Sequence, residues 1–212
     1  MTLPEPDAYR RRTLSILALF AALFRLLIRL PRIVAVHASA KRLRPTLRET
    51  LWLAVTEVNG CRFCAYVHEG MAAASGLSPE EIRLLAAGEA DSLPGLDDAE
   101  TLMVAYARAW ADTEGTPPPG LVDQLAEALT LAQVADLHAL LITVDFANRA
   151  GNTADSLLHR LGHPKQLLRI WPAFNDLIVG TLVAIFGWPA LVAGALVRWR
   201  TRAQRPSPPG KQ

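Results

Sequence analysis

The hydrophobic and polar positions of this chain follow a helical pattern through most of its length, and the pattern is interrupted by prolines, glycines and capping residues. No run alternates between polar and apolar residues with hairpin signals on both sides, as a half-buried strand would. An apolar stripe of helical period lets one face of each helix pack against a core. The pattern therefore predicts an all-α protein.

Local signals set the expected ends of these helices. Serine, threonine and aspartate stand where a side chain can accept from the first free N–H groups of a helix, and Gly76 suits the left-handed position after a helix. Residues 115–120, rich in glycine and proline, predict a loop. The expected helices cover about residues 13–30, 45–59 and 61–75, one opening at 78–81, one from 97–100 to 112, one from 130–133 to 148, and 152–161.

The C-terminal part is unusually apolar. Residues 177–197 carry no charge over 21 positions, a length that can span a bilayer. Gly187-Trp188-Pro189 interrupts the run near its middle, so each half would be only about 15 Å long. Gly180, Gly187 and Gly194 recur every seven residues, which leaves one helical face small enough for close packing. A membrane-inserted hairpin and a helical pair buried in an oligomer interface both stay open.

The N-terminal helix shows a related pattern. Arg25, Arg29 and Arg32 lie at helical spacing beside a wide apolar face. This arrangement is typical of a helix that lies in a membrane interface. It is equally compatible with an arm that packs on a neighbouring subunit.

Charge is distributed very unevenly, although the whole chain has a formal net charge of only +2. Residues 1–48 hold 10 basic and 2 acidic residues, residues 49–176 hold 7 basic and 18 acidic, and residues 177–212 hold 5 basic and none acidic. The basic ends therefore favour an anionic membrane surface or an acidic partner such as the middle of a neighbouring subunit. Nucleic acid is not expected, because exposed aromatics and binding motifs do not accompany the basic residues.

The chemistry of the chain is concentrated in Glu49, Cys61, Cys64 and His68. The two cysteines are the only ones among 212 residues, which is too few for a disulfide scaffold, and a close Cys-x-x-Cys pair indicates redox or metal chemistry. Cys61 is expected at a helix N-terminus, where backbone N–H groups favour a thiolate. His68 lies four residues after Cys64, within reach for proton transfer. The helix N-terminus therefore favours Cys61 as the nucleophile, whereas the spacing to His68 favours Cys64.

Glu49 and His68 are expected to meet. They stand about ten and eight residues from the Asn59-Gly60 break, so in antiparallel helices both would lie roughly 13–16 Å from the turn. A carboxylate in that position would orient the imidazole and stabilise its protonated form, as in a catalytic triad.

Other interpretations of these residues stay open. Cys61, Cys64 and His68 could bind zinc, although no fourth cysteine or histidine stands nearby. The cysteines could also be inert core residues. Phe63 and Tyr66 are expected either to line a pocket beside the dithiol or to be ordinary core aromatics. The remaining histidines are expected to be structural; they are His37, His138, His159 and His163.

The pattern Glu49-x₁₁-Cys61-x₂-Cys64-x₃-His68 resembles the signature of the carboxymuconolactone decarboxylase superfamily, in its alkylhydroperoxidase D (AhpD-like) branch. The surrounding residues 47–55, 59–64 and 76–82 are similar to it as well. The resemblance implies an all-helical fold that assembles into homo-oligomers. The resemblance covers only the AhpD-like domain, expected over 41–165. The residue pattern outside it predicts a basic, apolar helical arm over 1–40, an apolar helical segment over 166–203 and a disordered tail over 204–212.

In function, the resemblance implies a peroxidase that cycles through a Cys61–Cys64 disulfide, with Cys64 as the reactive thiol, Cys61 as the resolving thiol, and His68 and Glu49 as a proton relay. It implies no bound cofactor and no metal, a hydroperoxide substrate, and reduction by an external thiol or lipoyl-type dithiol protein. Arg62-Phe63 replace the family's histidine between the cysteines, which suggests a different oxidant. The expected location is the cytoplasm, with the inner face of the membrane as an open alternative. A non-redox decarboxylase or isomerase and a non-catalytic membrane or oligomeric module are the rival functions.

Overall fold

The computed structural model describes residues 12–163 and 170–203, and within these ranges the chain is helical and contains no strand. The predicted all-α class is confirmed. The predicted disordered tail, 204–212, lies outside the described residues. In chain order the elements are α1 (Ile16–Ala38), α2 (Pro45–Asn59), α3 (Arg62–Ser75), α4 (Pro79–Ala86), the short 3₁₀ helix η2 (Ala90–Ser92), α5 (Asp98–Asp112), α6 (Pro119–Ala128), α7 (Leu131–Gly162) and α9 (Ile170–Ala203).

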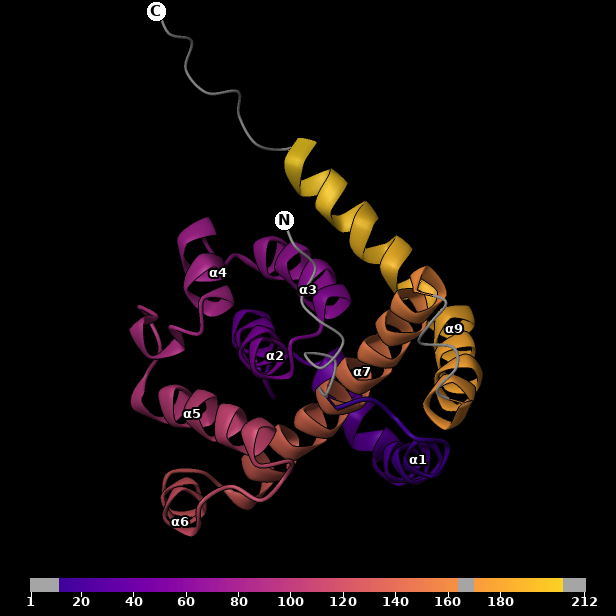
Figure 1. Ribbon diagram of the computed structural model, residues 1–212. Coiled ribbons are helices and arrows are strands. Elements are labelled where there is room, and N and C mark those ends of the chain that lie inside the picture. The colour runs from indigo at the N-terminus through magenta and orange to yellow at the C-terminus, as the bar shows by residue number, and fades with distance from the viewer. Residues whose placement is uncertain (1–11, 164–169, 204–212) are drawn as a thin grey trace, which may run out of the picture.

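Helix α2 occupies the centre of the fold and contacts α3, α4, α5 and α7 (Figure 1). Residues 49–56 of α2 are all buried, so this helix is enclosed on every side along that stretch. Burial of each large apolar side chain there contributes roughly 1.5–3 kcal/mol. The long helix α7 runs across the fold and carries α1 and α9 on its other side.

The predicted capping signals are present. Ser78, Asp97 and Thr130 each accept from the backbone N–H three residues on, and a glutamate or glutamine at that position bonds back to the cap. Gly60 and Gly76 end α2 and α3 in the left-handed conformation, with φ of 66° and 109°. Local sequence therefore determines where these helices begin and end.

The predicted break after Asn148 is wrong, because α7 continues without interruption to Gly162. Polar and glycine residues at 148, 151 and 152 resemble a helix end in the sequence, but each meets α2 or the start of α3. Asn148 accepts a hydrogen bond from Thr56 at 3.1 Å, and the Asn152 amide donates to the Asn59 carbonyl at 3.0 Å. These buried contacts outweigh the weak helix propensity of the residues that make them.

Two further predicted helix ends are wrong, and in both cases the helix passes through a proline. Helix α1 extends through Pro31 to Ala38, and α9 extends through Pro189. A proline removes one backbone hydrogen bond and bends a helix rather than always ending it. Figure 1 shows α9 changing direction between its orange and yellow parts.

Two of the three regularly spaced glycines lie at close helix contacts. A Cβ on Gly180 would lie 2.9 Å from Leu157 of α7, and a Cβ on Gly194 would lie 2.9 Å from Val67 of α3. Gly187 has no such neighbour outside its own helix. The apolar C-terminal segment therefore packs one face on this same chain. Within residues 12–163 and 170–203, none of the helices has the length and apolar character needed to cross a membrane.

Candidate active site

The turn between α2 and α3 brings Glu49 and His68 together. Gly60 reverses the chain, and the two helices pack side by side. His68 Nδ1 lies 2.7 Å from Glu49 Oε2, and both residues are buried, with 8% and 1% of their surface exposed. Because a carboxylate can only accept, Nδ1 carries the proton and donates it. The other ring nitrogen, Nε2, is then left to exchange a proton with a reacting group.

Trp52 holds the imidazole ring from one side, and the sequence analysis did not identify it. Its ring stacks on that of His68 with centroids 3.8 Å apart and an interplanar angle of 9°. Trp52 follows Glu49 by three residues and so lies on the same face of α2. That spacing was the available signal, but it would fit any core tryptophan equally well.

Cys61 and Cys64 form a disulfide across the first turn of α3, with their Cα atoms 5.3 Å apart. Cys61 is the N-cap residue of α3, and its sulfur accepts from the Cys64 N–H at 3.2 Å. Only 1% of Cys61 is exposed, whereas Cys64 is half-buried and its sulfur lies 3.5 Å from the Ala147 carbonyl oxygen. Exposure thus favours Cys64 as the thiol that meets a substrate, while the helix terminus favours a thiolate at Cys61.

Gly151 on α7 faces both sulfur atoms. A Cβ at this position would lie 2.6 Å from Cys61 Sγ, closer than real Cβ atoms approach other atoms, and 3.3 Å from Cys64 Sγ, which is a tight contact. Only glycine therefore lets the α7 backbone pass over the disulfide at this distance. The sequence offered no signal for this contact, because Gly151 lies 87 positions after Cys64.

We expect Gly151→Ala to destabilise the disulfide form. The added methyl group would overpack the site at a cost of about 1–3 kcal/mol, and the reduced sulfurs, which can separate, would be affected less. The change should therefore shift the thiol–disulfide equilibrium with dithiothreitol toward the reduced protein. Gly120→Ala on α6 is the control, because nothing lies within 4 Å of a Cβ there. Equal equilibrium constants for wild type and Gly151→Ala would contradict this interpretation.

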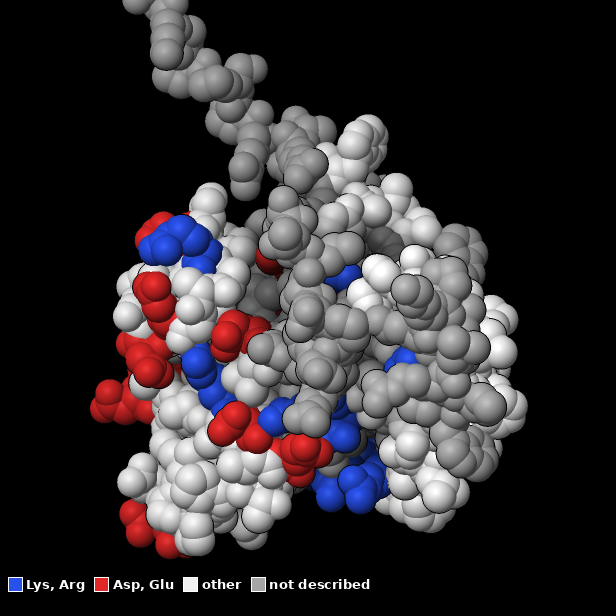
Figure 2. All heavy atoms as spheres, in the orientation of Figure 1, with Lys and Arg blue, Asp and Glu red and all other residues white. Residues whose placement is uncertain are grey.

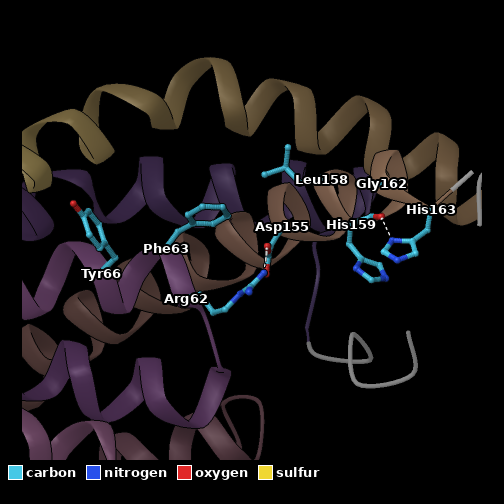
Figure 3. A pocket seen from close by; sticks show the side chains of 8 residues that line it. All are labelled: Arg62, Phe63, Tyr66, Asp155, Leu158, His159, Gly162 and His163. Carbon is cyan, nitrogen blue, oxygen red and sulfur yellow. Dashed lines mark hydrogen bonds and ion pairs between the residues drawn. The ribbon is translucent and has the colours of Figure 1, made fainter. Parts of the chain in front are cut away.

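A hollow of about 770 Å³ opens beside the dithiol, between α3 and the C-terminal half of α7 (Figure 3). Phe63 and Leu158 point into it toward α9, and Tyr66 stands at one end. Phe63 Cβ is also 3.9 Å from the Cβ position of Gly151, so this lining residue lies close to the place where α7 meets the two sulfur atoms. Phe63 and Tyr66 thus line a pocket beside the dithiol, one of the two roles expected for them.

The polar wall of this hollow combines an ion pair and two histidines. Arg62 binds Asp155, with Nη2 2.6 Å from Oδ1. His159, in the last turn of α7, stacks on His163, the residue that follows the helix, and Figure 3 shows the bond between His163 and the His159 carbonyl. Partial burial lowers the pKa of His159, and the neighbouring His163 acts in the same direction. The neutral form of His159 is therefore favoured near pH 7.

No group of three or more histidine, cysteine, aspartate or glutamate side chains in residues 12–163 and 170–203 is placed to hold a metal ion. His68 is turned toward Glu49, and the cysteines are joined to each other. The three zinc ligands considered from the sequence are thus engaged in other contacts in this state.

Comparison with known proteins gives one match. Residues 32–109 match the carboxymuconolactone decarboxylase family. No curated protein and no solved structure matches the chain. The matched region contains the cysteines, His68 and Glu49, and it ends before α7, which supplies Gly151 and half of the hollow.

Proposed function

We propose that this protein, whose residues 32–109 belong to the carboxymuconolactone decarboxylase family, reduces hydroperoxides through the Cys61–Cys64 pair in the manner of the AhpD-like branch. The observation that carries the proposal is a disulfide-forming cysteine pair at the start of α3, with His68 one helical turn after Cys64 and hydrogen-bonded to the buried Glu49 carboxylate. A carboxylate–imidazole pair in that position supplies the proton transfers that thiol chemistry on a peroxide requires.

The first half of the proposed cycle oxidises Cys64. Its thiol transfers a proton to Nε2 of His68, and the thiolate attacks the terminal oxygen of the hydroperoxide R–O–O–H. The O–O bond breaks, and the alkoxide leaves as the alcohol after it takes the proton from Nε2. Cys64 is left as a sulfenic acid. Glu49 holds the ring and stabilises its protonated form throughout.

The second half forms the disulfide. Cys61 loses its thiol proton and its thiolate attacks the Cys64 sulfur. The S–O bond breaks, and the hydroxide that leaves takes up that proton to form water. The dithiol has then supplied two electrons to the peroxide. An external dithiol protein or lipoyl-type reductant restores both thiols by exchange, so the protein itself needs no bound cofactor.

The hollow beside the dithiol supports a hydroperoxide with an apolar organic group rather than hydrogen peroxide alone. Phe63, Tyr66 and Leu158 offer apolar contact within the hollow, and Phe63 directly precedes Cys64 in the chain. Burial of each CH₂ group of the substrate there would contribute roughly 0.8 kcal/mol to binding.

A thiol titration tests the proposed function. The reduced protein should show two free thiols, since Cys61 and Cys64 are its only cysteines. One equivalent of cumene hydroperoxide should remove both and yield one equivalent of cumyl alcohol, and mass mapping should find the Cys61–Cys64 bond. Two thiols that persist after treatment, with no alcohol formed, would exclude a peroxidase.

The same buried pair favours one second candidate. Glu49 and His68 could also move a proton in a decarboxylase or isomerase reaction, which would need neither thiol. In that case a Cys61→Ser, Cys64→Ser double variant would keep its full decarboxylase or isomerase activity. If the protein is a dithiol peroxidase, the same variant would lose its activity toward peroxide.

A further inference from the structure

Helix α1 exposes an apolar face to the surroundings. Its inner side packs on α7, while Leu17 is 82% exposed and Phe20 and Leu27 are each 66% exposed. Phe24, Ile28 and other large apolar side chains continue this outer face along the helix. Monomeric soluble proteins rarely leave a contiguous apolar patch of this kind open to water, so the face marks an interaction site.

Helix α9 extends the same surface. Leu177 and Ile185 before Pro189, and Leu196 and Trp199 after it, are all more than half exposed, whereas Gly180 and Gly194 face α7 and α3. Helices α1 and α9 contact each other and both contact α7. We call the combined outer surface of these two helices the α1–α9 face.

The charged residues of α1, and those of α9 after Asp176, are all basic. No aspartate or glutamate occurs in residues 8–48 or 177–212. Arg25 and Arg29 are exposed at one edge of the apolar stripe of α1. Among the side chains that Figure 2 does not draw in grey, the acidic ones gather on the left over α4, α5 and α6, and none is seen on the right.

We propose that the α1–α9 face docks on an anionic lipid bilayer, with α1 and α9 lying in the membrane plane and the acidic face turned away. An apolar stripe bordered by arginines is the chemistry that binds such a surface, because the apolar side chains enter the acyl boundary and the guanidinium groups meet lipid phosphates. A second copy of this chain fits less well, since a two-fold interface would bring this basic face against itself.

Vesicle flotation of the full chain tests the proposal, and its outcome does not depend on peroxidase activity. The protein should float with vesicles of phosphatidylcholine and phosphatidylglycerol and bind far more weakly to phosphatidylcholine alone. Salt should release part of it, because surface attraction is screened within about 8–10 Å at physiological ionic strength. Arg25→Gln with Arg29→Gln should weaken binding to the anionic vesicles roughly tenfold or more.

A second variant probes the apolar part. Phe24→Glu with Leu27→Glu should reduce vesicle binding at least about tenfold, while Val122→Glu, on the exposed side of α6, should leave it unchanged. Both should keep the helical circular dichroism spectrum, since all three positions are exposed. Light scattering without lipid measures the oligomeric mass and so distinguishes a second copy of the chain from a lipid bilayer as the partner of the α1–α9 face. If the wild-type protein does not float, the membrane proposal fails. It fails as well if the α1 variant dissociates an oligomer and leaves flotation unchanged, because the face then binds a second copy.

Discussion

Cys64→Ser is expected to abolish hydroperoxide reduction, whereas each molecule of Cys61→Ser should still reduce one molecule of peroxide. Cys64 is the more exposed thiol, lies one turn before His68 and adjoins the hollow through its neighbour Phe63. Serine cannot replace it, because its hydroxyl stays protonated near neutral pH and does not attack peroxide oxygen. Stopped-flow measurement of peroxide consumption by the reduced proteins gives the rates.

The product of Cys61→Ser identifies the two roles. Without Cys61 no intramolecular disulfide can form, so Cys64 should remain as a sulfenic acid that dimedone traps and mass spectrometry locates. If trapping instead finds the sulfenic acid on Cys61 in the Cys64→Ser protein, Cys61 is the nucleophile. The thiolate stabilisation at its N-cap position would then outweigh its burial.

His68→Asn and Glu49→Gln should each slow the reaction of Cys64 with peroxide by roughly 10²–10⁴-fold, the usual contribution of one general acid–base group. Removal of the imidazole eliminates the proton acceptor. The Glu49→Gln amide keeps the shape of the carboxylate but loses the charge that stabilises protonated His68. The measurements are peroxide rates and the pH dependence of Cys64 alkylation in the reduced proteins.

His138→Asn is the matched control for these variants. His138, like His68, lies within a helix and is bonded to one side chain, here the Tyr106 hydroxyl, but it is half-buried and lies outside the candidate site. It should leave the peroxide rate unchanged. Alkylation profiles that coincide in wild type, His68→Asn and Glu49→Gln would exclude the relay, and any loss of activity would then have to come from packing of His68 on Trp52.

Much of the candidate site was predictable because its residues belong to two helices joined by one tight turn. The distance of Glu49 and His68 from Asn59-Gly60 predicted that they meet, and they do, at 2.7 Å. The disulfide needs only a helical turn between Cys61 and Cys64. The catalytic roles of these residues stay predictions for the experiments above.

The rest of the site comes from α7, far away in the sequence. Gly151 appeared to be a helix-breaking residue, yet its missing side chain makes room for both sulfur atoms. The hollow needs Leu158 and His159 opposite Phe63, and no spacing rule relates positions so far apart. Contacts between distant segments depend on how the helices pack, which local patterns do not describe.

The sequence by itself determined the all-α class, the helix starts at Ser78, Asp97 and Thr130, and the pairing of Glu49 with His68, because all of these depend on interactions within one helix or across one short turn. Only the tertiary structure decided that α7 runs on through Asn148, since a buried hydrogen bond to Thr56 holds that residue in the helix. It likewise decided that one side of α9 packs on α3 and α7 while the other side is open. An apolar stripe shows that a helix face must be covered, but the arrangement of the other helices determines what covers it.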